Sequence, residues 1–258
     1  WERPWEAIVS ALDFSRWDDV RLVRQIERDT MDHHPSELDD PLSILCLQGA
    51  ADGPSLDRLD LEAEFKVLTA AYDALDLSVR HAISQPIMVK PGFAELEAIL
   101  LDCRPTVLWF SGHARPNPPG LLLNDGHWLT PEEFSNLLQQ VQAKGGRTPL
   151  YIILLACETG SPGRFASPTA APPFINALGE DGVAALLVSQ TPLSDVAARQ
   201  IAIQVFTALA SGRPLDHGVA RARGELMRLA GANLVAEFDW IGPVVWSKGY
   251  LPPSLSWR

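Results

Sequence analysis

The sequence predicts an α/β fold with a central, mostly parallel β-sheet flanked by helices on both faces. From about residue 41 onward, short apolar runs alternate with helical patterns, which is the order of elements in parallel α/β proteins. Several runs are apolar at every position, as expected for strands buried on both faces. The chain has 258 residues, of which 47% are hydrophobic, enough for one large domain with its own core.

The first 40 residues differ from the rest and predict an N-terminal helical extension and linker (1–40). Within them, residues 19–31 predict a short helix, and the polar, proline-containing stretch 31–40 predicts a linker. We expect the main domain at 41–250 and a C-terminal tail at 251–258. Because the chain begins with Trp rather than Met, we also expect a fragment or processed chain with a neighbouring domain.

The first half of the main domain predicts three strands and two helices. The apolar run 42–47 predicts a buried strand, 78–84 a second and 106–110 a third. Between the first two, apolar residues recur every three or four positions, which lines one face of a helix. These residues are Leu61, Phe65, Leu68, Tyr72 and Leu75. A further helix is expected from Phe93 onward.

The second half begins with a hairpin, in which residues 121–123 and 127–129 flank Asn124-Asp125-Gly126. Thr130 and Glu133 then form the pattern of a capping box around Pro131, which predicts a helix start. The remaining elements are taken from apolar runs and helical spacing. They are strands at 150–156, 183–189 and 243–246 and helices at about 195–210 and 216–230.

A histidine and a cysteine each follow one of these predicted strands. His113 comes after 106–110, and Cys157 comes directly after 150–156. In parallel sheets, chemistry gathers at the carboxyl ends of the strands, and a thiol beside an imidazole is the basis of cysteine catalysis. A buried cysteine is more often a small apolar residue, and we interpret Cys46 and Cys103 in that way.

The sequence around His113 and Cys157 resembles the CHAT family, which belongs to the caspase–separase group of peptidases. The segment VLWFSGHA (107–114) is similar to the family's histidine motif, and YIILLACETG (151–160) to its cysteine motif. The similarity runs in order from about residue 41 to 247. It includes LDLEAEF (59–65), LLLNDGHWLTPEEF (121–134), residues 186–226 and FDWIGPVVW (238–246), and PWEAIV (4–9) resembles sequence that often precedes this domain.

This resemblance implies a caspase-like (caspase-hemoglobinase) three-layer fold and a cysteine endopeptidase that needs no metal and no cofactor. Cys157 matches the nucleophile and His113 the catalytic histidine. The oxyanion hole would consist of the backbone N–H groups of Cys157 and Ala114. The family usually has glycine in place of Ala114, which matters only if that position needs a positive φ. The sequence indicates no third member of the catalytic group.

The resemblance also raises the question of specificity. Asp195 matches an aspartate that is common after the fifth strand of the family, and an acidic substrate pocket would favour Lys or Arg before the cleaved bond. The alternative, which we prefer from the sequence, is that Asp195 caps the helix that follows Ser194. We interpret Glu158 as structural. The loop 161–173 is expected to be mobile, and either rearranges on activation or is an exposed insertion.

Composition and resemblance together suggest the setting. A formal net charge of −11 and the lack of a basic run argue against direct nucleic acid binding. Free cysteines fit a cytoplasmic protein, and no apolar run is long enough to span a membrane. The spacing of His33 and His34 matches no usual metal site. The family implies a protein substrate, a regulatory sensor domain or partner subunit, and a role in bacterial defence or cell death.

Two other hypotheses for the function remain open. The first is a catalytically inactive CHAT-like interaction module, which the substitution of alanine at position 114 would favour slightly. The second is a flavodoxin-like binding domain whose match to the motifs is accidental. No Walker loop, dinucleotide fingerprint or nucleophile elbow occurs in the sequence, which argues against a nucleotide-binding enzyme or a serine hydrolase.

Overall fold

The structure is a computed structural model that places most of the predicted main domain. It describes residues 23–25, 37–38, 41–52, 56, 58–157, 159–160, 172–179, 181–232, 239–247 and 256–257. None of the helices in these ranges is long and apolar enough to cross a membrane.

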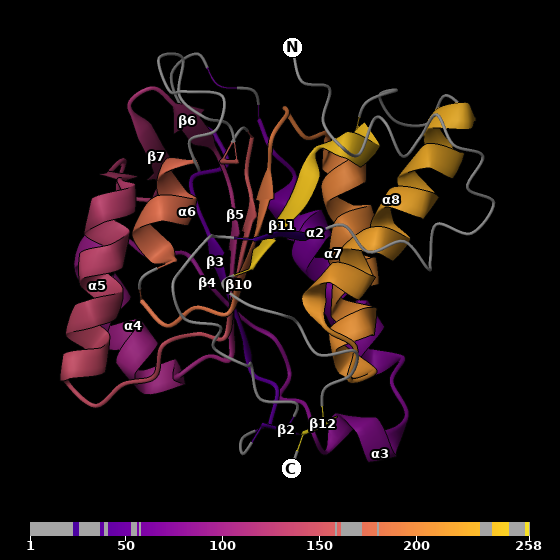
Figure 1. The fold of residues 1–258 in the computed structure, drawn as a ribbon, viewed down its shortest axis with the longest axis horizontal. Helices are drawn as coiled ribbons and strands as arrows, with labels where there is room; N and C mark the ends of the chain where they lie inside the picture. Colours follow the sequence, from indigo (N-terminus) through magenta and orange to yellow (C-terminus); the bar gives the residue numbers. More distant parts are fainter. Residues whose placement is uncertain are drawn as a thin grey trace.

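A seven-stranded sheet forms the centre of the molecule, in the order β1-β11-β10-β9-β5-β3-β4 (Figure 1). All neighbouring strands are parallel except β10 and β11, so the prediction of a mostly parallel sheet is confirmed. The strands are β1 (Val23–Gln25), β3 (Ile44–Gln48), β4 (Ile87–Val89), β5 (Val107–Ser111), β9 (Tyr151–Leu155), β10 (Ala185–Ser189) and β11 (Pro243–Ser247).

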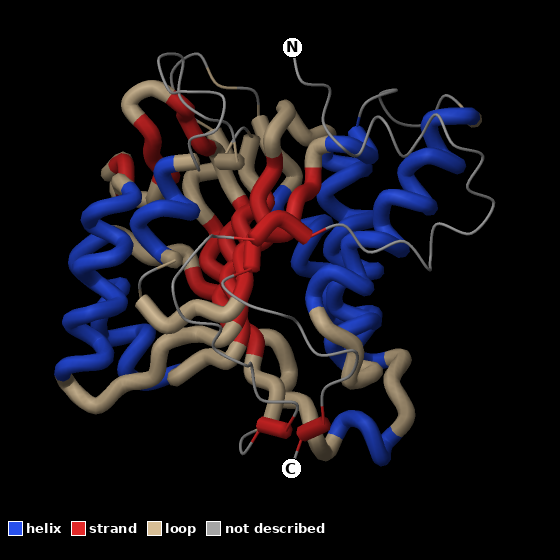
Figure 2. The backbone as a smooth tube through the Cα atoms, in the orientation of Figure 1, coloured by secondary structure: helices blue, strands red, loops and turns tan. Residues whose placement is uncertain are grey.

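Helices cover both faces of this sheet and complete three layers (Figure 2). One face carries α2 (Leu61–Asp73), α7 (Asp195–Ala210) and α8 (Leu215–Gly231), and the other carries α4 (Leu96–Cys103), α5 (Pro131–Ala143) and α6 (Pro173–Leu178). The described residues also contain the short helical segments α3 (Leu77–Arg80), η2 (Phe93–Glu95) and η3 (Asp239–Ile241).

The continuous apolar runs of the strands result from this double cover. Successive side chains of a strand point to opposite faces. In β5, Val107 and Trp109 pack in the core beneath α2, α7 and α8. Leu108 and Phe110 pack in the second core, beneath α4, α5 and α6. Each face has its own apolar core, so every position of the strand has to be apolar.

The hairpin and the capping box are also confirmed. Strands β6 (Ala114–Pro116), β7 (Pro119–Leu122) and β8 (Trp128–Leu129) form a small antiparallel sheet. At the start of α5, Thr130 Oγ1 accepts the N–H of Glu133 at 3.2 Å, and Glu133 Oε2 accepts the N–H of Thr130 at 2.9 Å. This reciprocal pair satisfies two N–H groups that a helix start leaves without partners.

The strand predicted at 78–84 is wrong. The N–H groups of Val79 and Arg80 both donate to the carbonyl of Asp76 at 3.0 Å, which closes the helical turn α3 instead. Of the predicted segment, Ile83 alone is bridged to another chain segment, at Leu42, and this bridge is isolated rather than part of a strand. The edge strand is instead β4, which begins just after Pro86. The prediction failed because an edge strand places few constraints on the apolar pattern, so that local hydrogen bonds decided the conformation of 78–84.

The N-terminal predictions need two corrections. Within the helix predicted at 19–31, residues 23–25 form β1, which pairs with β11 in parallel. Within the linker predicted at 31–40, β2 (Glu37–Leu38) pairs with β12 (Ser256–Trp257), which lies in the predicted C-terminal tail. Both pairings join residues far apart in the sequence, so the local pattern carries no signal for them. The other residues of these segments lie outside the described ranges.

Candidate active site

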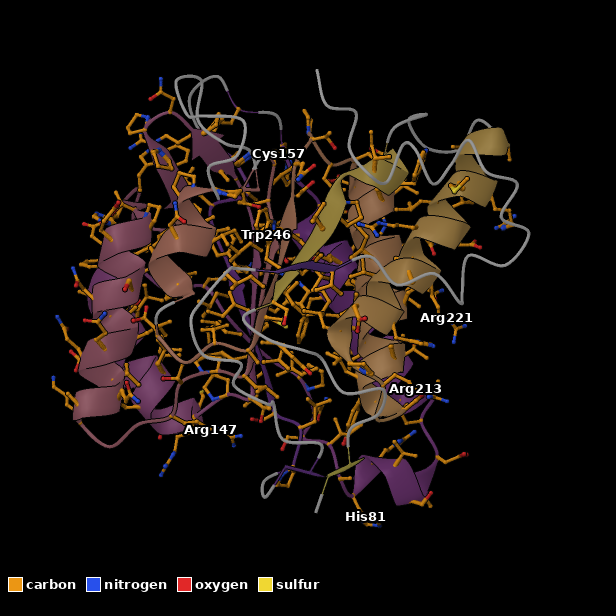
Figure 3. All side chains as sticks on the ribbon, in the orientation of Figure 1. His81, Arg147, Cys157, Arg213, Arg221 and Trp246 are labelled. Atoms are coloured by element: carbon orange, nitrogen blue, oxygen red, sulfur yellow. The ribbon has the colours of Figure 1, made fainter. Side chains whose placement is uncertain are left out.

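His113 and Cys157 lie at the same level of the same edge of the sheet. Strands β5 and β9 are neighbours, with Ser111 opposite Leu155 at their carboxyl ends. His113 lies two residues after Ser111, and Cys157 lies two residues after Leu155. Neighbouring strands of a sheet lie about 4.8 Å apart. Figure 3 shows Cys157 at the upper edge of the sheet, at the opposite end of the molecule from His81. The register thus places both residues that the sequence singled out at the carboxyl edge of the sheet, after neighbouring strands.

Both residues also lie on the side of the sheet that α2 and α7 cover. Ile153 and Leu155 face this core, and Cys157 follows in the turn after β9. Its Sγ accepts a hydrogen bond at 3.5 Å from the N–H of Leu193, just before α7. His113 Nε2 lies 3.4 Å from the carbonyl oxygen of Ala51, in the segment between β3 and α2. Both contacts are made with segments next to α7 and α2, so the candidate site lies on this side of the sheet.

The contact with Ala51 determines which imidazole nitrogen remains available. When Nε2 carries the proton, it donates to the Ala51 carbonyl, and Nδ1 is then the nitrogen that can accept a proton from a thiol. The imidazole is half-buried, so it is both oriented and reachable. The sequence could not predict this partner, because a backbone carbonyl is present at every residue.

The turn after Cys157 is bonded to the neighbouring strand β10. Thr159 Oγ1 donates to the carbonyl of Ala156 at 3.2 Å and accepts the N–H of Ser189 at 3.1 Å. Gly160 N–H donates to the Ser189 carbonyl at 2.7 Å. A Cβ on Gly160 would lie 2.6 Å from Val188 Cγ2, closer than any side chain tolerates. The turn after Cys157 is therefore held by hydrogen bonds at Thr159 and by close packing at Gly160.

Replacing Thr159 by valine will lower the free energy of unfolding by about 1–3 kcal/mol, because the buried N–H of Ser189 loses its acceptor while the shape of the side chain is kept. The measurement is urea denaturation. Thr148→Val is the matched control, since Thr148 Oγ1 is buried without a hydrogen-bond partner among the described residues. The control should change stability by less than about 0.5 kcal/mol. Equal losses in both variants would contradict the role of Thr159.

The turn that carries His113 is packed against the end of β3. Gly49 N–H donates to the Ser111 carbonyl at 2.9 Å. A Cβ added to Gly49 would collide with the carbonyl oxygen of Leu122, and one added to Gly112 would lie 3.2 Å from Gly49 Cα. Backbone therefore packs on backbone here, which places the histidine turn firmly over the sheet edge.

Ala114 can supply a backbone donor beside His113. It lies opposite Leu121 in the β6–β7 ladder, and the next pair is hydrogen-bonded, since Leu122 N–H donates to the His113 carbonyl at 2.9 Å. Hydrogen-bonded and non-hydrogen-bonded pairs alternate in an antiparallel ladder, so the N–H of Ala114 points away from β7. Among the described residues only Arg104 combines a side chain with a positive φ. Alanine at position 114 therefore carries no left-handed strain.

Asp195 does not cap α7, so the interpretation that we preferred from the sequence is wrong. Ser194 is the cap: its Oγ accepts the N–H of Ala197 at 3.2 Å and donates to Asp239 Oδ2 at 2.6 Å. Asp195 is the first residue of the helix, and its Oδ2 accepts the N–H of Asp60 at 3.4 Å. Because Ser194 caps the helix, the carboxylate of Asp195 is left to face the start of α2. Asp195 lies two residues after Leu193, whose N–H contacts Cys157.

One ionisable residue beside the site was missed by sequence reasoning. Glu64 of α2 is 5% exposed, and its Oε1 accepts hydrogen bonds from Trp109 Nε1 at 3.1 Å and from the hydroxyl of Ser111. Burial, with a smaller effect of the Asp195 charge, raises the pKa of this carboxyl to about 7. A signal was present, because Glu64 stands between Leu61 and Leu68 on the buried stripe of its helix.

A cavity of about 500 Å³ lies beside Ala51, the contact of the histidine. It shares Ala51 with the contact of His113 and opens between the ends of β3 and β4. Its lining mixes acidic, basic and amide groups. The lining residues are Gln48, Gly49, Ala51, Arg58, Leu59, Asp60, Leu61, Glu62, Lys90 and Asn124.

The other candidate residues lie outside this site or outside the description. Cys46 is buried, and burial raises the pKa of its thiol; desolvation also raises the pKa of Cys103. His127 Nε2 lies 3.2 Å from Glu133 Oε2, in the hairpin region. The described ranges contain no group of three residues suited to a metal ion. Glu158, His33, His34 and residues 161–171 lie outside the described residues.

Comparison with known proteins adds a family and two structural likenesses. The sequence model of the CHAT domain matches residues 61–248. Among curated proteins, no sequence matches. The Arg-specific cysteine proteinase gingipain R (RgpB) is similar in structure, with a TM-score of 0.54, 15% identity, and coverage of 84% of this chain and 47% of that chain. The complex of Porphyromonas gingivalis RgpB pro- and mature domains is similar with a TM-score of 0.53 and 16% identity. The match covers 84% of this chain and 48% of that chain.

These likenesses establish the fold class. The chain has the caspase-like α/β fold of these cysteine proteinases, as the sequence predicted, and it spans about half of their length. Caspase-1 from Spodoptera frugiperda gives a TM-score of 0.45 at 12% identity, with coverage of 92% of this chain and 100% of that chain, and it adds nothing to this conclusion.

Proposed function

The chain belongs to the CHAT domain family, and from that premise we propose that it is a cysteine endopeptidase with a Cys157–His113 dyad. The observation that carries the proposal is the matched position of the two residues, each two places beyond the paired Ser111 and Leu155. The test is cleavage of a mixed peptide library by the wild type and by Cys157→Ala.

The proposed reaction is hydrolysis of a peptide bond through a thioester. Cys157 Sγ attacks the scissile carbonyl carbon while His113 Nδ1 takes the thiol proton. The oxyanion of the tetrahedral intermediate is bound by the N–H groups of Cys157 and Ala114. The C–N bond then breaks, and the imidazolium gives its proton to the leaving amine. Water then gives a proton to His113 and attacks the thioester carbon; the C–S bond breaks, the carboxylic acid product leaves, and the imidazolium returns the proton to the thiolate, which restores the thiol. The Ala51 carbonyl keeps the imidazole in the tautomer that this sequence of steps needs.

We propose Asp195 as the acidic group of the substrate pocket. Its carboxylate is half-buried and does not cap α7. It follows the segment that contacts Cys157, and Asp60 at the start of α2 lies beside it. A carboxylate two residues after the segment that contacts Cys157 favours a cationic side chain before the cleaved bond. The similar gingipain R is described as Arg-specific, which supports the same preference here.

Asp195→Asn will lower kcat/KM for substrates with Lys or Arg before the cleaved bond by about 10- to 100-fold, because the neutral amide no longer attracts the cation. Substrates with uncharged residues at that position should lose much less. The measurement is kcat/KM for matched peptides that differ in this residue. Asp76→Asn, an exposed acid at the start of α3, is the control. Equal losses for cationic and neutral peptides would count against the pocket.

A second candidate is a catalytically inactive CHAT-like interaction module. The hydrogen bond of Cys157 Sγ with Leu193 N–H rather than with the imidazole favours it. In the peptidase this contact would belong to a resting state, from which the thiol turns to His113 when substrate binds. Reaction of Cys157 with a peptide electrophile separates the two candidates.

The family likeness also supports a setting for the proposed activity. We propose that the substrate is a protein and that a sensor domain or partner subunit controls the peptidase. A role in bacterial defence or cell death, in the cytoplasm, fits such control, and direct nucleic acid binding by this domain is not part of the proposal. The net charge of −11 favours partners with basic surfaces.

A further inference from the structure

Glu64 is a buried acid beneath the turn that carries His113. It lies in α2, on the face that packs against the sheet, and 5% of it is exposed. Its Oε1 accepts the indole N–H of Trp109 at 3.1 Å and the hydroxyl of Ser111. Trp109 and Ser111 are alternate residues of β5 and therefore point to the same face. The carboxyl thus joins α2 to the last residues of the strand that leads to the histidine.

Ser111 is the point through which this contact reaches the candidate site. It is the last residue of β5 and precedes His113 by two positions. Its backbone carbonyl accepts Gly49 N–H at 2.9 Å, so β3 holds its main chain, while Glu64 holds its side chain. The direction in which the chain leaves the strand, and with it the position of the imidazole, depends on these two bonds.

We propose that Glu64 is a positioning residue for His113, which acts through Ser111 and holds the histidine turn more firmly when its carboxyl is ionised. The catalytic consequence rests on the proposed peptidase function, whereas the coupling between Glu64 and the turn does not. Hydrogen bonds to a carboxylate are shorter and stronger than those to a neutral acid. Loss of the proton from Glu64 therefore tightens the bonds to Ser111 and Trp109.

The groups around Glu64 place the loss of its proton near neutral pH. Burial raises the pKa of the carboxyl from its ordinary 4.5 to about 7. The hydrogen bonds from Ser111 and Trp109 oppose the rise. From α7, the charge of Asp195 adds to the rise and that of Arg199 opposes it. From β3, Cys46 faces the carboxyl with a buried thiol.

The same shift sets the sign of the effect on stability. The pKa of Glu64 is higher in the folded chain than in the unfolded chain, so the folded state binds the proton more tightly between about pH 4.5 and about pH 7. The stability that Glu64 contributes is complete below about pH 4.5 and is lost as the pH rises through about 7. The ionised form that holds the histidine turn is thus reached at a cost in fold stability, as is common at functional sites.

An NMR titration tests the coupling without any catalysis. All proteins carry His113→Gln, which removes the titration of the imidazole itself. From about pH 5 to about pH 9, the Glu64 side-chain carbon and the Gly112 amide should shift together with a midpoint near 7. Glu64→Gln should abolish both shifts. Ser111→Ala should keep the shift of Glu64 and strongly reduce that of Gly112. A Gly112 amide that does not respond, or that responds equally after Ser111→Ala, overturns the proposal.

The second measurement is the rate at which a peptide electrophile labels Cys157 over the same pH range, in a chain with His113 intact. Glu64→Gln should be about tenfold slower than wild type above pH 7, the factor expected for one charge-assisted hydrogen bond, and equal to it near pH 5.5, where Glu64 is neutral. Glu132→Gln, an exposed acid in α5, should match wild type. A loss that is equal at all pH values indicates a purely structural role and overturns the proposal. If wild-type Cys157 reacts no faster than Cys103, the peptidase proposal fails, and the titration still decides the coupling.

Discussion

Cys157→Ala will abolish cleavage of every peptide bond that the wild-type chain cuts, with a loss of at least about 10³-fold in kcat/KM. The proposed reaction passes through a covalent thioester on this sulfur, and alanine offers no nucleophile. The substitution removes one half-buried atom that accepts a single hydrogen bond of 3.5 Å, so the fold should be retained. The measurement is digestion of a mixed peptide library, with the cut sites identified by mass spectrometry.

The matched control for this prediction is Cys103→Ala. Cys103 lies at the end of α4, on the opposite face of the sheet from α2 and α7, and its loss should leave the cleavage pattern unchanged. A Cys157→Ala protein that still cuts the same bonds would show that another group performs the chemistry. Cleavage by wild type alone would also give the residue before the cut, and Lys or Arg there would support the pocket role of Asp195.

Replacement of His113 by glutamine should lower kcat/KM by about 10²- to 10⁴-fold, the usual contribution of a general base. The amide of glutamine can still donate to the Ala51 carbonyl, 3.4 Å from the imidazole Nε2, so the turn should keep its position. It cannot accept the thiol proton, however, so the thiolate no longer forms by transfer to residue 113. The measurement is kcat/KM of the wild type and of His113→Gln for the same peptides.

His127→Gln serves as the control for that variant. His127 contacts Glu133 in the hairpin region and stacks on Phe93, with ring centroids 4.5 Å apart. Its loss should leave kcat/KM within a factor of about two of wild type, as for most changes away from a site. Comparable losses in the two variants would mean that general disturbance of this edge, rather than the loss of a proton acceptor, explains the effect of His113→Gln.

The sequence was sufficient for the central strands of the sheet because their signal is local, and it led from them to the two candidate residues. A strand buried on both faces must be apolar at every position, and this marked the runs that became β3, β5, β9 and β10. Chemistry in parallel α/β proteins lies where such strands end, and this directed attention to His113 and Cys157. The register that places them at one level came from the structure alone.

The predictions that failed depended on partners distant in the sequence. The edge of the sheet at β4 and the addition of β1 beside β11 are set by pairings across the fold, which a local pattern does not carry. The role of Asp195 depended on which of two adjacent residues capped α7; the cap is Ser194, whose hydroxyl also bonds to the distant Asp239. The contact of His113 with Ala51 involves a backbone atom, for which no residue type gives a signal.

The most direct test of the central claim is covalent labelling of the intact wild-type chain with an electrophilic peptide, followed by location of the adduct by mass spectrometry. Burial raises the pKa of the Cys46 thiol, and desolvation raises that of Cys103, so neither should compete. A single adduct on Cys157, lost in His113→Gln, is the predicted result. An unmodified Cys157, or labelling of Cys157 and Cys103 at equal rates, would contradict a cysteine peptidase and favour the interaction module.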